Sequence, residues 1–194
     1  LSTGDRPMTE SLKPLGEPAA LAVAFEEVAA YLRLESEDER ALVDSLIRRA
    51  TAAMEVHLRR SLIARPMRLR LDQWPLGAVR MPRPPLATLD AVRVYDRAGT
   101  PQPVDPARFR VDDHAEPGLV IPIAAYAPPA PGVLKAGIEL DFTAGYGSGW
   151  NAVPGDIRHA LVMTVAEWFD TRSGDAAIPA GALALVRGYR VIGL

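Results

Sequence analysis

The sequence contains few residues that could do chemistry, and their spacing does not gather them into a catalytic or metal site. It has three histidines and no cysteine. His57, His114 and His159 lie far apart, so the short His spacings that hold zinc on one helix are missing. Without cysteine, disulfides and thiolate metal sites are excluded. These residues therefore indicate neither a metal centre nor a nucleophilic enzyme.

One helical stretch leaves a small enzyme open as a hypothesis. Asp156 and His159 are three residues apart, as are Glu167 and Asp170, so each pair shares a helical face. Such a face could supply a metal-dependent hydrolase with ligands. Solvated helix charges explain the same pattern, because charged side chains normally lie on the surface. We predict no catalytic residue, no cofactor and no metal ligand, and keep the hydrolase as the less favoured alternative.

A glycine-rich turn before a helix is a second place where a ligand could bind. Three glycines in residues 145–149 follow a predicted strand and precede a helix that begins at Pro154. A phosphate-binding loop needs Gly-Lys-Ser or Gly-Lys-Thr at the start of its helix, whereas Trp150 follows the last glycine here. We interpret the turn as a corner that leads from the strand into the helix.

Basic charge is concentrated in the middle of the chain. The net charge is −2, but residues 1–47 carry −6, residues 48–110 carry +8 and residues 111–194 carry −4. Such segments can pair within one fold or between identical copies, and a basic segment can also neutralise DNA phosphates. A solvated mixed surface remains the simpler interpretation. The candidate inter-subunit or DNA-facing charges are Arg48, Arg49, Arg59, Arg60, Arg68 and Arg70.

Hydrophobic periodicity predicts an α+β fold that is mainly a helical bundle with a β-rich insertion. A short apolar stripe begins at Phe25 and ends near Arg33, and a capping box at residues 36–39 starts a long helix that ends near Arg60. These two helices make an αα-hairpin. The helix over residues 154–172 carries two apolar stripes, so we expect it to be central. Pro179 begins a further helix.

Period-two alternation predicts strands in the middle of the chain. They cover residues 67–71, 89–95, 109–111, 119–121 and 138–143. We therefore divide the chain into a flexible N-terminal arm, the N-terminal helices, the β-rich insertion, and the C-terminal helices with a tail. These parts are residues 1–23, 24–66, 67–144 and 145–194.

No apolar run reaches the roughly 18 residues of a membrane-spanning helix. Residues 1–30 also lack the pattern of a secretory signal. We expect no membrane partner. Met8 is a possible natural start, and the sequence leaves open whether residues 1–7 are native.

Several segments, taken in order, carry a resemblance to a known family. In the first half they are Phe25-Glu26-Glu27-Val28, Tyr31-Leu32-Arg33-Leu34, Glu37-Asp38-Glu39, Ile47 and Ala50, residues 69–75 and residues 82–86. In the second half they are Phe142-Thr143-Ala144-Gly145-Tyr146-Gly147, Pro154, Ile157, Ala160-Leu161, Trp168 and Arg172. The set resembles the head-tail connector, or head-completion adaptor, family of long-tailed phages and gene transfer agents.

The resemblance implies a structural protein without catalytic residues. Family members assemble as a ring, typically of twelve subunits, beneath the portal, join the capsid to the tail and line the DNA exit channel. The implied partners are the portal protein, tail-side connector or stopper proteins, further copies of the chain, and passing DNA without sequence preference. The implied location is the head-tail interface of a virion or phage-like particle made in the bacterial cytoplasm.

By position, the resemblance also implies that the C-terminal segment docks on the portal. The candidate docking residues are Leu183, Val186, Arg187, Tyr189, Arg190, Val191 and Ile192. A DNA-binding or packaging accessory protein that uses the arginine-rich middle is the main alternative. The sequence leaves open whether the particle is a phage or a gene transfer agent, how many subunits associate in solution, and which surface meets the portal or the tail.

Overall fold

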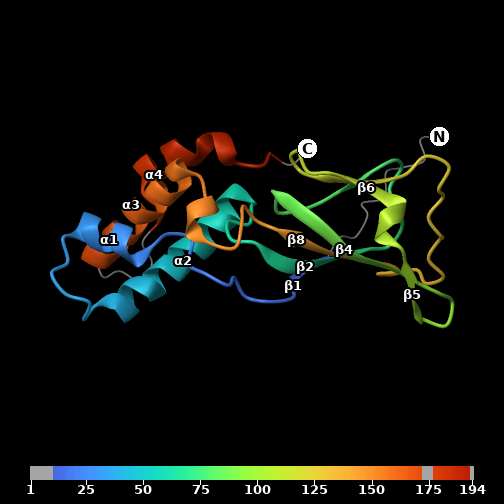
Figure 1. The fold of residues 1–194 in the computed structure, drawn as a ribbon, viewed down its shortest axis with the longest axis horizontal. Coiled ribbons are helices and arrows are strands. Elements are labelled where there is room, and N and C mark those ends of the chain that lie inside the picture. Colours follow the sequence, from blue (N-terminus) through green and yellow to red (C-terminus); the bar gives the residue numbers. More distant parts are fainter. Residues whose placement is uncertain (1–10, 172–176, 193–194) are drawn as a thin grey trace. The chain divides into compact units, whose positions relative to one another are not determined.

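The computed structural model describes residues 11–171 and 177–192. In this part of the chain the fold is α+β, with four α-helices and two antiparallel sheets (Figure 1). The residues separate into two compact units. We call residues 11–17 and 66–144 the sheet unit, and residues 18–65 together with the described part of 145–192 the helical unit.

The helical unit is arranged around its longest C-terminal helix. The helices are α1 (Phe25–Leu32), α2 (Arg40–Leu58), α3 (Gly155–Thr171) and α4 (Ala180–Val186). Helix α3 packs against each of the other three, as its two apolar stripes led us to expect. A helix that is apolar over most of its circumference must be covered on several sides. Helix α3 is therefore the hub of the helical core.

Trp168 shows how α3 is covered near its end. Its side chain is 4% exposed, its indole Nε1–H donates to the carbonyl oxygen of Ala177 over 3.2 Å, and the Arg49 guanidinium lies 4.8 Å above its ring. The indole thus contacts both α2 and the segment that leads into α4. Its burial links three parts of the helical unit.

The predicted capping box at the start of α2 is wrong. Helix α2 begins at Arg40, its N-cap residue is Glu39, and no side chain caps it. The Ser36 hydroxyl accepts a hydrogen bond from the backbone N–H of Asp38 (3.3 Å) and donates to the Asp38 carboxylate (2.9 Å). This local side-chain turn competes with helix capping and keeps residues 36–39 outside the helix.

The sheet unit holds a five-stranded sheet in the order β1-β2-β8-β4-β5 and a three-stranded sheet in the order β3-β7-β6. One hydrophobic cluster contains residues from both sheets, including Leu69, Phe142, Phe109 and Val120. The strands are β1 (Ser11–Pro14), β2 (Arg65–Leu71), β3 (Val79–Arg80), β4 (Leu86–Tyr95), β5 (Pro101–Val104), β6 (Phe109–Asp112), β7 (Leu119–Pro122) and β8 (Ile138–Ala144).

The expectation of a flexible N-terminal arm over residues 1–23 is wrong for the part that the structure describes. Strand β1 pairs antiparallel with β2, with Ser11 opposite Arg70 and Pro14 opposite Met67. Ala22 and Val23 are completely buried in the helical core. The free backbone groups along the edge of β2 give the arm a template for pairing. Residues 1–10 lie outside the described part of the chain.

The prediction of a mainly helical protein also understated the β structure. Strand β5 contains two prolines and was not predicted, because proline cannot donate to a ladder. It lies at the edge of its sheet, where that loss is tolerated.

No helix among the described residues is both long and apolar enough to cross a membrane.

Replacing Trp168 by alanine should destabilise the protein by about 3 to 5 kcal/mol, because a buried indole is removed and a cavity remains. Urea unfolding followed by circular dichroism measures the change. Trp150→Ala is the matched control, since Trp150 is 40% exposed and should cost much less. Equal losses in the two variants would contradict the central position of Trp168.

Candidate functional site

The glycine turn is a packing corner. Gly145 has φ of +136°, and a Cβ placed on it would come within 2.4 Å of the backbone nitrogen of Ala64. The N–H of Ala64 donates to the carbonyl oxygen of Gly147 (2.8 Å), and that of Tyr146 donates to the carbonyl oxygen of Leu62 (3.2 Å). The turn is therefore occupied by the chain's own backbone, and α3 starts only after the short helix η2 (Trp150–Ala152).

The acidic and histidine residues of α3 all lie on its solvent-exposed side. Asp156, His159, Glu167 and Asp170 are exposed, and the His159 ring meets the Tyr31 ring edge-on at 6.2 Å. Within residues 11–171 and 177–192, no group of three or more His, Asp or Glu residues is placed to hold a metal ion. These residues form a charged stripe along the helix instead of a site for hydrolysis.

Arg68 and Arg70 belong to an ion-pair network on the five-stranded sheet. Arg68 on β2 donates to the Asp141 carboxylate on β8 through Nε (2.6 Å) and a terminal nitrogen (2.9 Å). Arg70 donates to Glu139 over 2.7 Å, and Arg93 on β4 donates to Asp141 over 2.7 Å. The two arginines thus bind carboxylates of their own chain, and are not free charges for DNA or a neighbouring subunit as the sequence suggested.

The network is needed because the Glu139 carboxylate is buried and that of Asp141 is largely shielded from water. The Glu139 side chain is 2% exposed, and removing such a carboxylate from water is costly unless it is paired and hydrogen-bonded. The hydrogen bonds from Arg68, and secondarily those from Arg93, lower the pKa of Asp141 below its ordinary value although burial opposes this. The partners Glu139, Asp141 and Arg93 were missed as a site. The sequence did contain a pattern that could have found them: arginines at alternate positions of one predicted strand and carboxylates at alternate positions of another.

The remaining candidate arginines lie on α2 or directly after it. Arg48 and Arg59 are exposed. Arg49 is exposed and stacks over Trp168. Arg60 is buried, and its Nε–H donates to the carbonyl oxygen of Tyr189. Arg60 is thus covered by the C-terminal segment of its own chain, and the prediction that it faces DNA or another subunit is not supported by its position.

The C-terminal segment is partly packed into the helical core. Val186 is completely buried, and Tyr189 packs against the core while its hydroxyl donates to the Asp156 carboxylate (3.3 Å). The N–H of Val191 donates to the carbonyl oxygen of Leu58 (3.0 Å). Leu183 is half-buried. Val186, Tyr189 and Val191 therefore anchor the segment to its own chain.

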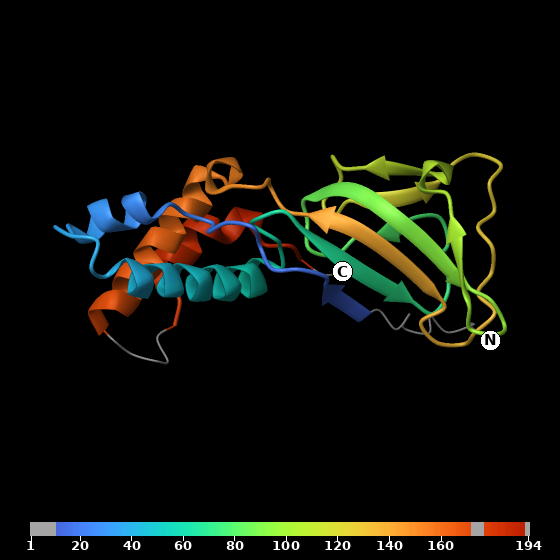
Figure 2. The same ribbon diagram turned by 60° about the horizontal axis from the view of Figure 1, so that its bottom comes forward.

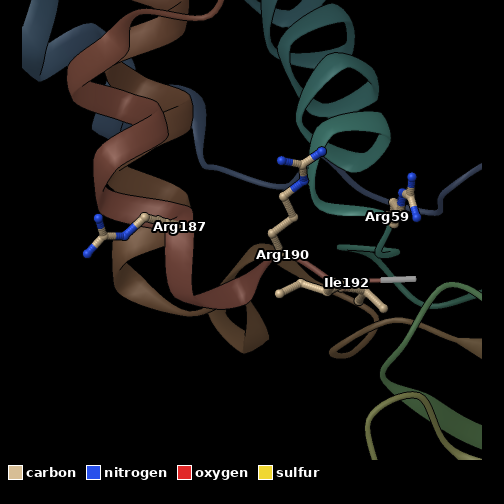
Figure 3. A pocket seen from close by; sticks show the side chains of 5 residues that line it. Arg59, Arg187, Arg190 and Ile192 are labelled. Atoms are coloured by element: carbon tan, nitrogen blue, oxygen red, sulfur yellow. The ribbon is translucent and has the colours of Figure 1, made fainter. Parts of the chain in front are cut away.

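Beyond these anchors, the segment forms one wall of an open pocket. The pocket has a volume of about 430 Å³ and is lined by Arg59, Arg187, Arg190, Val191 and Ile192. Arg190 lies between Arg187 and Arg59 in Figure 3. The Ile192 side chain is 81% exposed. Three guanidinium groups beside an exposed aliphatic side chain suit an anionic and apolar protein surface better than a small metabolite.

Comparison with known proteins found relatives among solved structures alone. No protein-family model matches the chain. A search of curated protein sequences also found no match.

The chain is 31% identical to a chain from the neck of an empty gene transfer agent (GTA) particle solved with C6 symmetry. That alignment has a TM-score of 0.79 and covers 95% of this chain and 97% of the other. It is similarly 31% identical to a chain of the native GTA neck solved with C12 symmetry, with a TM-score of 0.75 and coverage of 95% and 97%. The chain belongs to the family of GTA neck proteins.

A third similar chain comes from the virion of a native GTA particle, at 32% identity and a TM-score of 0.78, with 94% of this chain and 96% of that chain covered. The predicted location in a phage-like particle is confirmed at the level of the family, whose solved members lie in GTA necks and virions. Membership of this family indicates a structural role for the chain in the neck of a GTA particle.

The stability of this GTA neck protein should fall in acid partly because of Asp141. The pKa of Asp141 is lower in the folded chain than in the unfolded chain. Its contribution to the free energy of unfolding is therefore complete above the unfolded-state pKa of about 4, and is lost as the pH falls through the folded-state pKa. Chemical unfolding measured from pH 7 to pH 3 should show a smaller decline in Asp141→Asn, which starts from lower stability. The exposed Asp113→Asn variant should follow the wild type, and an unchanged acid decline in Asp141→Asn would contradict the assignment.

Proposed function

We propose that this GTA neck protein is the head-tail adaptor of its particle. It assembles as a ring beneath the portal, joins the capsid to the tail and lines the channel through which DNA leaves. The observation that carries the proposal is the match over nearly the full chain to neck components solved with C6 and C12 symmetry. Cyclic symmetry supports a ring, and C12 symmetry supports twelve copies.

The arrangement of charge supports a channel that passes DNA without holding it. A DNA-binding accessory protein would present many free cations to phosphates and bind in a salt-dependent manner. Here Arg68, Arg70 and Arg93 are paired with carboxylates, and Arg60 is buried. The pairing leaves fewer cations for phosphate than the +8 charge of the middle segment suggests. The structural adaptor is therefore preferred over the DNA-binding alternative.

The C-terminal pocket is the proposed portal contact. Val186, Tyr189 and Val191 fix the segment to the helical core, and the exposed Ile192 together with Arg187 and Arg190 presents a mixed apolar and cationic surface. Removing the whole segment from residue 179 onward would also remove the buried Ala182 and Val186. A single substitution at the exposed end is the cleaner test.

Particles produced without this chain should contain heads and tails that are not joined, and the wild-type chain should restore joining when it is supplied. Electron microscopy of purified particles measures the joined fraction. Tails attached at the normal frequency in the absence of the chain would contradict the adaptor function.

Ile192→Asp should fold normally and strongly reduce the joined fraction, because it places a carboxylate and its solvation shell at an apolar contact. Leu134→Asp, at a highly exposed aliphatic residue of the sheet unit, is the matched control. Circular dichroism confirms folding in both variants. Normal joining with Ile192→Asp would rule out the C-terminal pocket as the portal contact and leave the adaptor function intact.

A further inference from the structure

The exposed side of α2 is not covered by another helix or strand of the described residues, although Arg49 at its edge stacks over Trp168. The exposed residues of α2 and of its C-cap lie on one side of the helix, and none of them is a carboxylate; the half-buried Asp44 borders this side one turn before Arg48. Two of its side chains are strongly exposed hydrophobics, Leu42 at 52% and Val56 at 68%. We call this the basic face, and its exposed residues are Ala41, Leu42, Ser45, Arg48, Arg49, Ala52, Val56 and Arg59.

The exposed side of α3 has the opposite charge. Asp156, Glu167 and Asp170 lie on one narrow stripe with His159, and the stripe contains no lysine or arginine. Met163 lies half-buried in the middle of the stripe. Asp156 accepts a hydrogen bond from the Tyr189 hydroxyl. The Glu167 and Asp170 side chains have no ion-pair partner in the described chain. We call this stripe the acidic face.

The two faces cannot meet within one copy of the chain. Helices α2 and α3 lie side by side and bury their apolar sides in the same core (Figure 2). Their exposed sides consequently point to solvent. Between two copies, however, the basic face of one helix can lie along the acidic face of the other.

The spacing of the charges matches as well as their sign. Arg48 and Arg59 are separated by eleven residues, and Asp156 and Glu167 are also separated by eleven. Eleven residues make about three helical turns, so Asp156 and Glu167 lie on one line along α3 and span about 16 Å. Arg48 lies on α2, and Arg59 is the C-cap residue directly after its last turn. Because the spacings in sequence are equal, two ion pairs could form together in either a parallel or an antiparallel arrangement of the helices, with Val56 and Met163 between them.

We propose that the basic face of α2 binds the acidic face of α3 from a second copy of this chain, and that this contact repeats around the ring. The inference rests on the proposed ring function and names its interface. A cyclic ring is built from heterologous contacts, in which two different faces of each subunit must complement one another. The C6 and C12 symmetries of the related necks require such a pair of faces.

Charge reversal tests the interface. Arg48→Glu/Arg59→Glu and Asp156→Arg/Glu167→Arg each place like charges opposite one another, and each should lower the joined fraction of particles by at least about tenfold. Because Arg59 also lines the C-terminal pocket and Asp156 holds Tyr189, the single variants Arg48→Glu and Glu167→Arg are tested as well and should lower the joined fraction in the same direction. The four substitutions together exchange the two faces and should restore joining to near the wild-type level. The control, Arg97→Glu/Arg110→Glu, reverses two exposed arginines of the sheet unit and should assemble normally. Thermal unfolding checks that each variant folds.

Two results would overturn this interface: normal joining by both reversed variants, or no restoration in the folded fourfold variant. Failure of the adaptor function appears differently, as heads and tails that join when the chain is absent. Rescue by the fourfold variant also excludes DNA as the occupant of the basic face, because DNA would not be attracted to the reversed face.

Cross-linking provides an independent readout because the chain has no native cysteine. Arg48→Cys/Glu167→Cys tests one helix orientation and Arg48→Cys/Asp156→Cys tests the other. In assembled particles, a short bismaleimide should convert one of these variants into a ladder of covalent oligomers. The single variant Arg48→Cys should give no ladder. The absence of a ladder from both double variants would overturn the proposal.

Discussion

The helical unit depends on the burial of α3. Ile157, Leu161 and Val165 are completely buried, and α1, α2 and α4 each pack against this helix. Covering so much of one helix leaves only a narrow stripe of it in solvent, and that stripe must be polar. The acidic face of α3 is thus a consequence of core packing. The same core turns the arginines of α2 outward on another side, so one packing arrangement produces two faces of opposite charge.

In the sheet unit the corresponding constraint is the burial of Glu139, together with the partly buried Asp141, on β8. Three arginines from β2 and β4 satisfy these carboxylates, with Arg68 and Arg93 both contacting Asp141. A buried pair of this kind gives little net stability over an apolar pair, but losing one partner is costly. The arginine-rich middle therefore has a structural role in the sheet. Its charge cannot be read as a measure of affinity for DNA.

These two constraints fit a protein that works by assembly. A ring subunit needs a rigid core, two complementary flanks and a separate surface for the next component of the particle. The helical core supplies the flanks, and the anchored C-terminal segment presents Ile192 and its neighbouring arginines as a further surface. None of these surfaces needs a nucleophile, a cofactor or a metal ion, in agreement with the family of structural neck proteins to which the chain belongs.

The sequence by itself determined the helices at each end, most strands of the middle and the resemblance to a connector family, because apolar periodicity and glycine or proline breaks are local signals. The helical spacing in the sequence also placed Asp156 on the same side of α3 as His159, and Glu167 on the same side as Asp170. Only the tertiary structure decided that β1 pairs with β2, that Arg60 is buried, and that Arg68 and Arg70 are neutralised by β8. Each of these depends on which distant segment lies opposite. Residue type and spacing along one segment do not specify that partner.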